Sequence, residues 1–161
     1  MKWLELRILP VFVVSIFGVL IWLSSSFFYV VRLSFSYQDI ASLVMALLGV
    51  GVIVSGVLGF RKQDTTVNPT TPEQASQLVT RGIYRYSRNP MYLGMLLFLM
   101  AFAVYLFTLT GWLWVPVFVL YMNKFQIQPE ERILERIFGQ EYVEYRNKVR
   151  RWIRIIVLAF E

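Results

Sequence analysis

Polar residues disappear from long stretches of this chain, whereas a soluble helix needs polar positions along its exposed face. No charged residue occurs at positions 8–31 or 40–60. At ~1.5 Å per residue, a helix over either stretch is long enough to cross the ~30 Å hydrocarbon core of a bilayer. The pattern therefore predicts a transmembrane helix in each of them.

A third uncharged stretch, residues 91–123, is too long for one span and short of the ~40 residues that two spans need. The segments on either side of this stretch, residues 61–90 and 124–161, are both rich in Lys and Arg, and they indicate how many times the stretch crosses the membrane. Such clusters mark the cytoplasmic side of a membrane protein. Two cytoplasmic flanks require an even number of crossings, so we expect this stretch to form a hairpin.

The hairpin is predicted to consist of spans at residues 91–108 and 112–128, with a turn near residues 108–111. Its second helix is expected to continue past Asn123 into the cytoplasm. The predicted fold is therefore all-α. We expect a polytopic integral membrane bundle of about four transmembrane helices, with residues 1–161 in a single membrane domain and both termini cytoplasmic.

Small residues recur every four positions within the second predicted span, at Gly51, Ser55 and Gly59. Small side chains at this spacing let a neighbouring membrane helix approach closely. We therefore expect this face of the helix to pack inside the bundle.

The remaining segments are polar and are expected on the cytoplasmic side, as a loop at residues 61–90 and a tail at residues 129–161. Within the loop, a short helix is predicted at residues 72–77. Within the tail, a helix is predicted to run to Phe138 and to end at Gly139 in the left-handed conformation.

Further along the tail, Tyr142, Tyr145, Val149 and Ile153 lie at helical spacing, opposite a basic face. This pattern predicts an amphipathic helix that lies on the membrane surface. Residues 152–160 are apolar but too few to span a bilayer, so we expect them in the interface or against the bundle.

Composition narrows the possible chemistry. The chain has 161 residues, is 57% hydrophobic, carries a formal net charge of +6 and contains neither His nor Cys. The usual zinc sites, thiol nucleophiles, disulfides and His-based triads are therefore excluded, and no metal is expected. The Lys and Arg residues flank apolar stretches, which favours contact with anionic lipid headgroups over nucleic acid.

Two polar clusters at the ends of the predicted hairpin are candidates for a binding site. The first, residues 82–94, combines arginines, tyrosines and an asparagine and suits a polar ligand with an anionic group. It is equally typical of a basic membrane anchor with an aromatic belt. The second is the pair Glu130 and Glu131, which is also typical of an ordinary helix start after Pro129.

The order of these residues resembles that of the isoprenylcysteine carboxyl methyltransferase family and its phospholipid methyltransferase relatives. The resemblance covers nearly half of the chain. The first block consists of Leu78, Val79, Thr80, Gly82, Tyr84, Arg88, Asn89, Pro90, Tyr92 and Gly94. The second block consists of Glu130, Glu131, Leu134, Phe138, Gly139, Tyr142, Tyr145 and Val149. Both blocks in this order, with a hydrophobic hairpin between them, make the match specific.

This resemblance implies an S-adenosylmethionine-dependent methyltransferase, with a cofactor pocket built from both blocks at the cytoplasmic mouth of the hairpin. An arginine suits the carboxylate of this cofactor, and a carboxylate pair suits its ammonium and sulfonium. Members of the family methylate prenylated cysteine carboxylates, lipid amines and small thiols, so a membrane-embedded or hydrophobic acceptor is expected. The residues carried over as S-adenosylmethionine contacts are Tyr84, Arg88, Asn89, Tyr92, Glu130 and Glu131.

The chain departs from the family pattern at three places. Asn89 stands where the family usually has His, and Ser76 stands where many members have another His. Residues 149–152 lack the usual nearby proline. An asparagine can keep a hydrogen bond but cannot titrate near neutral pH.

The missing histidines also constrain the mechanism. Methyl transfer to a carboxylate needs no general base, whereas transfer to a thiol or a protonated amine requires removal of a proton. Alignment of the reactants can by itself contribute ~7 to 11 kcal/mol. If a base is needed, Glu131 is the candidate and Tyr92 a weaker one; Arg88 completes the predicted catalytic set.

Two other functions stay open. Sterol reductases share a related carboxy-terminal pattern and use NADPH, although the Glu130 and Glu131 pair and the short chain favour the methyltransferase. The second alternative is a non-catalytic membrane adaptor on the same scaffold. The small size and plain architecture suggest a prokaryotic cytoplasmic membrane.

Overall fold

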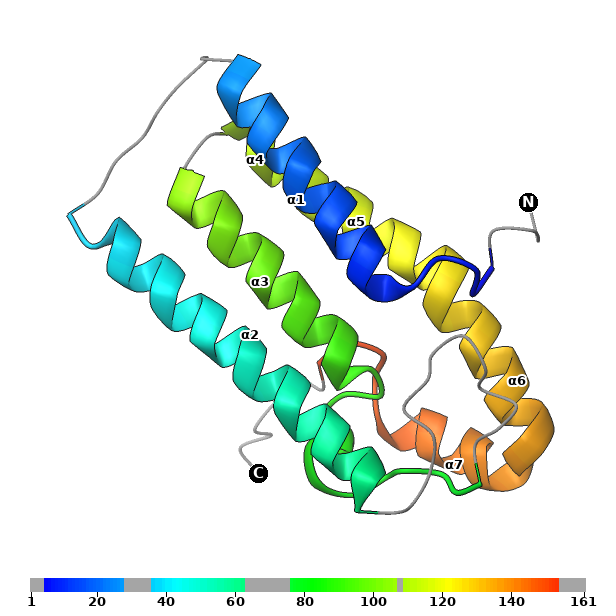
Figure 1. The fold of residues 1–161 in the computed structure, drawn as a ribbon. Helices are drawn as coiled ribbons and strands as arrows, with labels where there is room; N and C mark the ends of the chain where they lie inside the picture. Colours follow the sequence, from blue (N-terminus) through cyan, green and yellow to red (C-terminus); the bar gives the residue numbers. More distant parts are fainter. Residues whose placement is uncertain (1–4, 28–35, 63–75, 107–108, 154–161) are drawn as a thin grey trace, which may run out of the picture.

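The computed structural model describes residues 5–27, 36–62, 76–106 and 109–153, and every regular element within these ranges is helical (Figure 1). The all-α prediction is therefore confirmed. In chain order the elements are α1 (Pro10–Phe27), α2 (Gln38–Arg61), the short 3-10 helix η3 (Gly82–Arg85), α3 (Pro90–Leu106), α4 (Leu109–Trp112), α5 (Trp114–Met122), the π-helical turn η4 (Asn123–Ile127), α6 (Gln128–Phe138) and α7 (Gln140–Lys148).

Helix α3 lies in the middle of the bundle, with α2 on one side and α1 and α5 on the other. Helices α4, α5, η4 and α6 follow one another as a nearly continuous rod that runs antiparallel to α3 (Figure 1). Helices α3 and α5 thus form the predicted hairpin, and the second of its helices continues past Asn123 as expected.

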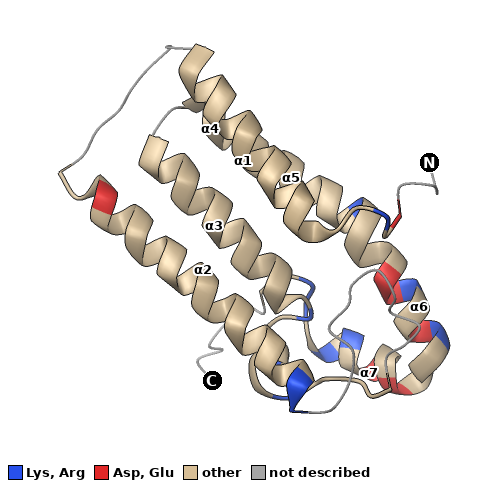
Figure 2. Ribbon diagram, viewed as in Figure 1, with Lys and Arg blue, Asp and Glu red and all other residues tan. Residues whose placement is uncertain are grey.

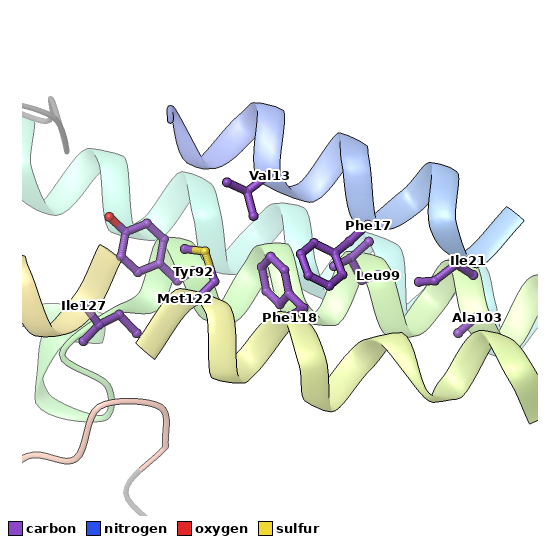
Figure 3. Close-up of a cluster of buried hydrophobic side chains, with 9 residues drawn as sticks. All are labelled: Val13, Phe17, Ile21, Tyr92, Leu99, Ala103, Phe118, Met122 and Ile127. Carbon is purple, nitrogen blue, oxygen red and sulfur yellow. The ribbon is translucent and has the colours of Figure 1, made fainter. Parts of the chain in front are cut away.

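The core runs lengthwise between α1, α3 and α5 (Figure 3). Its aromatic rings pack edge to face: the Phe17 and Phe118 centroids are 5.4 Å apart with an interplanar angle of 77°. Tyr92 closes the core at the end where η4 begins. The buried members are Val13, Phe17, Ile21, Tyr92, Leu99, Ala103, Phe118, Met122 and Ile127.

Two helices are long and apolar enough to cross a membrane: α1, with a mean hydropathy of 2.0, and α2, with a mean hydropathy of 2.5. Helix α3 is also apolar but has only 17 residues. The outer face of α2 exposes eight aliphatic side chains, and exposed apolar patches of this kind are typical of surfaces that contact a membrane or another protein. They are Ile40, Leu43, Val44, Leu47, Leu48, Val50, Val54 and Leu58.

Among the described residues, positive charge is confined to one end of the bundle. The described Lys and Arg residues gather at the end that carries α6 and α7 (Figure 2). Within the described ranges, the opposite end carries only Asp39, in the first turn of α2. This segregation agrees with the charge pattern from which the membrane orientation is predicted.

The closest helix contact involves glycines other than those predicted. Gly49 of α2 faces Gly94 of α3, and a Cβ at Gly94 would lie 2.5 Å from the Gly49 carbonyl oxygen. Gly51 and Ser55 are exposed, and a Cβ at Gly51 would meet no atom within 4 Å. The predicted packing face was therefore wrong for Gly51 and Ser55, because small residues occur on both faces of α2 and their spacing alone does not say which one packs.

The π-helical turn η4 has a local cause. Pro129 has no N–H, so it cannot bond the carbonyl four residues earlier, that of Phe125, and its ring would clash with it. The wider π-helical turn relieves the clash. The Phe125 carbonyl instead accepts a hydrogen bond from the Leu6 N–H at 3.1 Å, and Gln126 Nε2 donates to the Ile8 carbonyl at 2.6 Å. The segment before α1 is thereby held on η4.

The tail differs from its prediction in two respects. Gly139 ends α6 with a positive φ of 51°, but its ψ of −123° is outside the left-handed helical region that was expected. Helix α7 ends at Lys148, so Val149 is extended and Ile153 lies beyond the helix. The tyrosine face of α7 packs on Val79 and other protein residues rather than facing the membrane, because periodicity does not distinguish lipid from protein.

Some predicted features fall outside the described residues. These are the end of the first predicted span at residues 28–31, residues 72–75 of the predicted short helix, residue 108 of the turn predicted at 108–111, and residues 154–160 of the predicted apolar segment. The other residues of the predicted turn, 109–111, belong to helix α4, so the turn prediction was wrong at these positions. Gln77, the last residue of that short helix, is described and is not helical.

The contact between Gly49 and Gly94 predicts a specific stability change. Gly94→Ala places a methyl group 2.5 Å from both the Gly49 carbonyl oxygen and Ile53 Cγ1, so α2 and α3 must separate. We expect a loss of about 1–3 kcal/mol in the free energy of unfolding, measured in detergent. The control is Gly51→Ala, which meets open space and should change stability by no more than about 1 kcal/mol. Equal losses in the two variants would contradict this packing.

Candidate functional site

Arg88 occupies the short approach to α3, two residues before Pro90. Its side chain is only 9% exposed, and its Nη1 lies 2.8 Å from Glu131 Oε1 of α6. The same nitrogen donates to the Tyr142 hydroxyl at 3.2 Å. An ion pair this deeply buried requires close geometry and further hydrogen bonds. The two sequence blocks at the ends of the hairpin therefore meet in space.

A second guanidinium completes this ion cluster. Arg151 Nη2 lies 2.7 Å from Glu131 Oε2, and its Nε donates to Glu131 Oε1 at 3.0 Å. Glu131, whose side chain is 11% exposed, therefore accepts from Arg88 on one side and binds Arg151 in bidentate fashion on the other. The bond to Glu131 raises the pKa of Arg151, so its positive charge is secure.

Glu130 has a different environment from its neighbour. Tyr92 lies in the first turn of α3, and its hydroxyl donates a hydrogen bond to Glu130 Oε2 at 3.1 Å. Although Glu130 keeps part of its surface exposed, burial of its carboxyl group raises its pKa from 4.5 to about 7. The hydrogen bond from Tyr92 opposes this rise, and the negative charge of Glu131 adds to it.

The position of the two acids depends on η4. The sequence is also compatible with a helix that starts at Glu130 and Glu131. In the structure, however, α6 continues directly from η4 and α5. The π-helical turn adds one residue to the helix and so rotates the following side chains by about 100° relative to α5. Both acids consequently face the start of α3 rather than lying on a free helix end.

Asn89 holds the segment that carries Arg151. Its Nδ2 donates to the Arg151 carbonyl at 3.1 Å, and the Ser87 hydroxyl donates to the same carbonyl at 3.1 Å. The Arg88 N–H donates to the Arg150 carbonyl at 3.0 Å. Further along, Trp152 Nε1 donates to Asn123 Oδ1 at 3.2 Å. Residues 150–152 thus form a strap across the site.

Tyr84 stands apart from the other predicted site residues. Its hydroxyl is buried and donates to the Gly56 carbonyl of α2 at 3.4 Å, and its ring meets Phe60 edge to face at 5.4 Å. Its own carbonyl accepts from the Tyr145 hydroxyl at 2.8 Å. Burial raises the pKa of Tyr84 well above its usual value. Tyr84 therefore joins α2, η3 and α7 and does not contact Glu131.

The sequence interpretation did not identify Arg151 or Tyr142 as site residues. Arg151 looked like one of several surface cations in the tail, and Tyr142 looked like part of a membrane-facing stripe. Both contact the ion cluster only because α7 folds back on Arg88. Periodicity cannot show that the chain changes direction between α6 and α7. The glycine expected to end the helix at Gly139 was the local indication of this change.

An open groove borders the ion cluster. It has a volume of about 430 Å³, and Arg88 and the strap residues are among those that line it. Three of its lining residues are arginines from the strap and from α7. Among the described residues, no three carboxylates gather as a metal ion would require. All the charged side chains that line the groove are cationic, so the groove suits an organic ligand with an anionic group. The lining residues are Arg88, Arg146, Asn147, Val149, Arg150, Arg151, Trp152 and Ile153.

The comparison with known families agrees with this arrangement. A family model described as phospholipid methyltransferase matches residues 37–141, which include α2, the hairpin and both acids. The chain belongs to the phospholipid methyltransferase family. It is therefore a member of a membrane methyltransferase family, as its apolar helices and the resemblance of its two blocks indicated.

Individual relatives connect this family member with isoprenylcysteine methyltransferases. The protein-S-isoprenylcysteine O-methyltransferase of Saccharomyces cerevisiae is 39% identical over 83 residues, 50% of this chain and 34% of the relative. A probable protein-S-isoprenylcysteine O-methyltransferase of Oryza sativa subsp. indica is 31% identical over 121 residues, 70% of this chain and 59% of the relative. This chain thus matches about a third to three fifths of the length of these two proteins.

A shorter relative matches over its whole length. This uncharacterized protein of Haemophilus influenzae is 49% identical over 63 residues, 39% of this chain and 100% of the relative. No solved structure matches the chain.

The environment of Glu130 predicts a pH dependence of stability. Between about pH 4.5 and 7, Glu130 holds a proton in the folded chain and loses it in the unfolded chain, so its contribution to stability falls as the pH rises. Glu130→Gln should therefore flatten the dependence of the melting temperature on pH across this interval. Tyr92→Phe removes the hydrogen bond that lowers this pKa and should extend the dependence to higher pH. Equal slopes in wild type and Glu130→Gln would contradict the raised pKa.

Proposed function

We propose that this protein is an S-adenosylmethionine-dependent methyltransferase that acts on a membrane-embedded or hydrophobic acceptor. The acceptor class comprises carboxylates such as isoprenylcysteine, and lipids. The observation that carries the proposal is the 2.8 Å ion pair between Arg88 and Glu131, which joins the two blocks of the family resemblance at one end of the hairpin. Similarity to named isoprenylcysteine O-methyltransferases supports the same reaction.

The residues at the cluster fit the charges of S-adenosylmethionine. Arg88 Nε is buried and has no hydrogen-bond partner in the part of the chain that the structure describes, so this arginine retains a donor for a carboxylate. Where the acceptor is already an anion and no base is needed, Glu130, which bonds Tyr92, would hold the ammonium or the sulfonium. Asn89 would act by fixing the strap beside them. Tyr84 would not contact the cofactor but would hold η3 against α2 and α7 through its hydrogen bonds to both helices.

When bound, S-adenosylmethionine supplies an electrophilic methyl group on a sulfonium. The protein's contribution is to orient the two reactants and to exclude water around the buried Arg88 and Glu131, since alignment can contribute ~7 to 11 kcal/mol. Glu131 would keep Arg88 and Arg151 in place rather than react, because its oxygens accept from both guanidiniums.

Where an acceptor must lose a proton, Glu130 is better suited than Glu131 to receive it. Glu131 was the candidate base from the sequence, but it bonds two permanent cations. Glu130 bonds only the neutral Tyr92 hydroxyl among the described residues, and burial raises its pKa to about 7. A general base is most effective when its pKa lies near the working pH.

The membrane orientation is also a proposal. All four hydrophobic segments would cross the bilayer, with the basic end of the bundle, both termini and the ion cluster on the cytoplasmic side (Figure 2). The distribution of Lys and Arg supports this orientation. A prokaryotic cytoplasmic membrane is part of the same proposal.

Ligand binding tests the cofactor. Adding S-adenosylhomocysteine to the purified chain in detergent should raise its melting temperature by a few degrees, because a ligand that binds only the folded state stabilises it. NADPH should produce no shift. A shift with NADPH alone would favour a reductase, and no shift with either nucleotide would favour a non-catalytic adaptor. Labelled methyl transfer into a total lipid extract then identifies the acceptor fraction.

The ion cluster predicts different effects for two acids on α6. Glu131→Gln leaves Arg88 and Arg151 without their carboxylate, so turnover should be lost and stability should fall by about 3 kcal/mol. Glu135→Gln is the matched control, because Glu135 pairs with Arg146 at 2.6 Å on a half-exposed surface. It should keep turnover and lose less than about 1 kcal/mol. Turnover is compared at a temperature at which circular dichroism shows both variants folded, and unchanged turnover in Glu131→Gln would remove Glu131 from the catalytic set.

A further inference from the structure

A second groove lies at the basic end of α2, away from the ion cluster. Its volume is about 580 Å³, and it is separated from the cluster side by Tyr84, whose ring packs beneath Gly59. One wall is the last part of α2 and its cap, and the other is the entry to η3. The lining residues are Ser55, Leu58, Gly59, Lys62, Arg81, Gly82 and Ile83.

Two of the residues that line the groove are glycines, one in each wall. Gly82 has a φ of 64°, a conformation that favours glycine, and a Cβ there would meet no atom within 4 Å. At Gly59, a Cβ would lie 3.0 Å from Tyr84 Cε2, so the backbone of α2 rests directly on that ring. Neither wall can acquire a larger side chain at these two positions without strain or a clash.

The mouth of the groove is positively charged. Lys62 and Arg81 come from different walls, and both side chains are exposed. None of the ion pairs among the described residues involves either cation, and no acidic residue lines the groove. Two such cations on facing walls are complementary to a single anionic group such as a phosphodiester.

Below the mouth, the groove becomes apolar. Leu58 belongs to the outer face of α2, and it continues along that helix into Val54 and Val50, each about half exposed. Ile83 contributes from the opposite wall. This face belongs to a helix that is long and apolar enough to cross a membrane. A ligand that fills the groove therefore needs an anionic head and a hydrocarbon chain.

We propose that this groove binds an anionic phospholipid, with its phosphate between Lys62 and Arg81 and an acyl chain along the outer face of α2 at Leu58. The site is distinct from the cluster of Arg88 and Glu131 and does not depend on methyl transfer. Because the phosphate bridges α2 and the entry to η3, the bound lipid stabilises the segment that leads into Arg88.

Native mass spectrometry of the full chain, released from nanodiscs that contain equal amounts of phosphatidylglycerol and phosphatidylcholine, tests the proposal. The wild type should retain phosphatidylglycerol in preference. The double variant Lys62→Gln and Arg81→Gln should lose about 30-fold in apparent affinity for it, since each cation near an anionic lipid surface contributes about fivefold. The matched control, Arg136→Gln with Lys148→Gln, removes the same charge from exposed positions of α6 and α7 that do not line the groove.

A second pair of variants tests the apolar part. Ser55→Leu fills the groove from an exposed position, whereas Gly51→Leu adds the same bulk one turn earlier, into open space. Only Ser55→Leu should reduce lipid retention, and circular dichroism verifies that both variants fold. The proposal is overturned if the charge-matched control loses as much lipid as the groove variant, if both lipids are retained equally, or if millimolar inorganic phosphate displaces the lipid and so identifies a free-anion site.

Discussion

One carboxylate between two guanidiniums organises the functional end of this protein. Glu131 lies on α6, Arg88 precedes α3, and Arg151 belongs to the strap after α7, so a single side chain joins three segments. Burying a charge costs several kcal/mol unless it is paired, and removing one partner of a buried pair costs about 3–5 kcal/mol. The fold therefore has a strong energetic reason to keep these segments together. The amide of Asn89 and the hydroxyl of Ser87 add neutral bonds to the same strap.

The direction in which Glu131 points is decided several residues earlier. Pro129 cannot complete an α-helical hydrogen bond, and the π-helical turn before it releases the Phe125 carbonyl to the Leu6 N–H. One local irregularity thus rotates the two acids and also fixes the segment before α1. Glu130 then bonds Tyr92 and Glu131 bonds the two arginines, so adjacent residues of the same type acquire different partners.

The sequence predicted the features that depend on length and charge. Uncharged stretches indicated α1, α2 and the hairpin, because the bilayer sets the length of a spanning helix. The family resemblance placed Arg88 and Glu131 together, and they form an ion pair. Other features depend on tertiary packing and could not be predicted in this way. The periodicity predicted the tyrosine face of α7 but could not show that this face packs on protein. Small residues occur on two faces of α2, so their spacing could not identify Gly49 as the contact with α3.

The helical path runs from α5 through η4 into α6, so the acid pair lies on the same rod as the second helix of the hairpin. An axial displacement of α5 against α3 therefore moves Glu130 and Glu131 relative to the start of α3. A shift of one helical residue, ~1.5 Å, exceeds the distance tolerance of a hydrogen bond. Lipid bilayers that differ in thickness impose different tilts on embedded helices. The geometry of the acid pair is then coupled to the thickness of the lipid around the bundle.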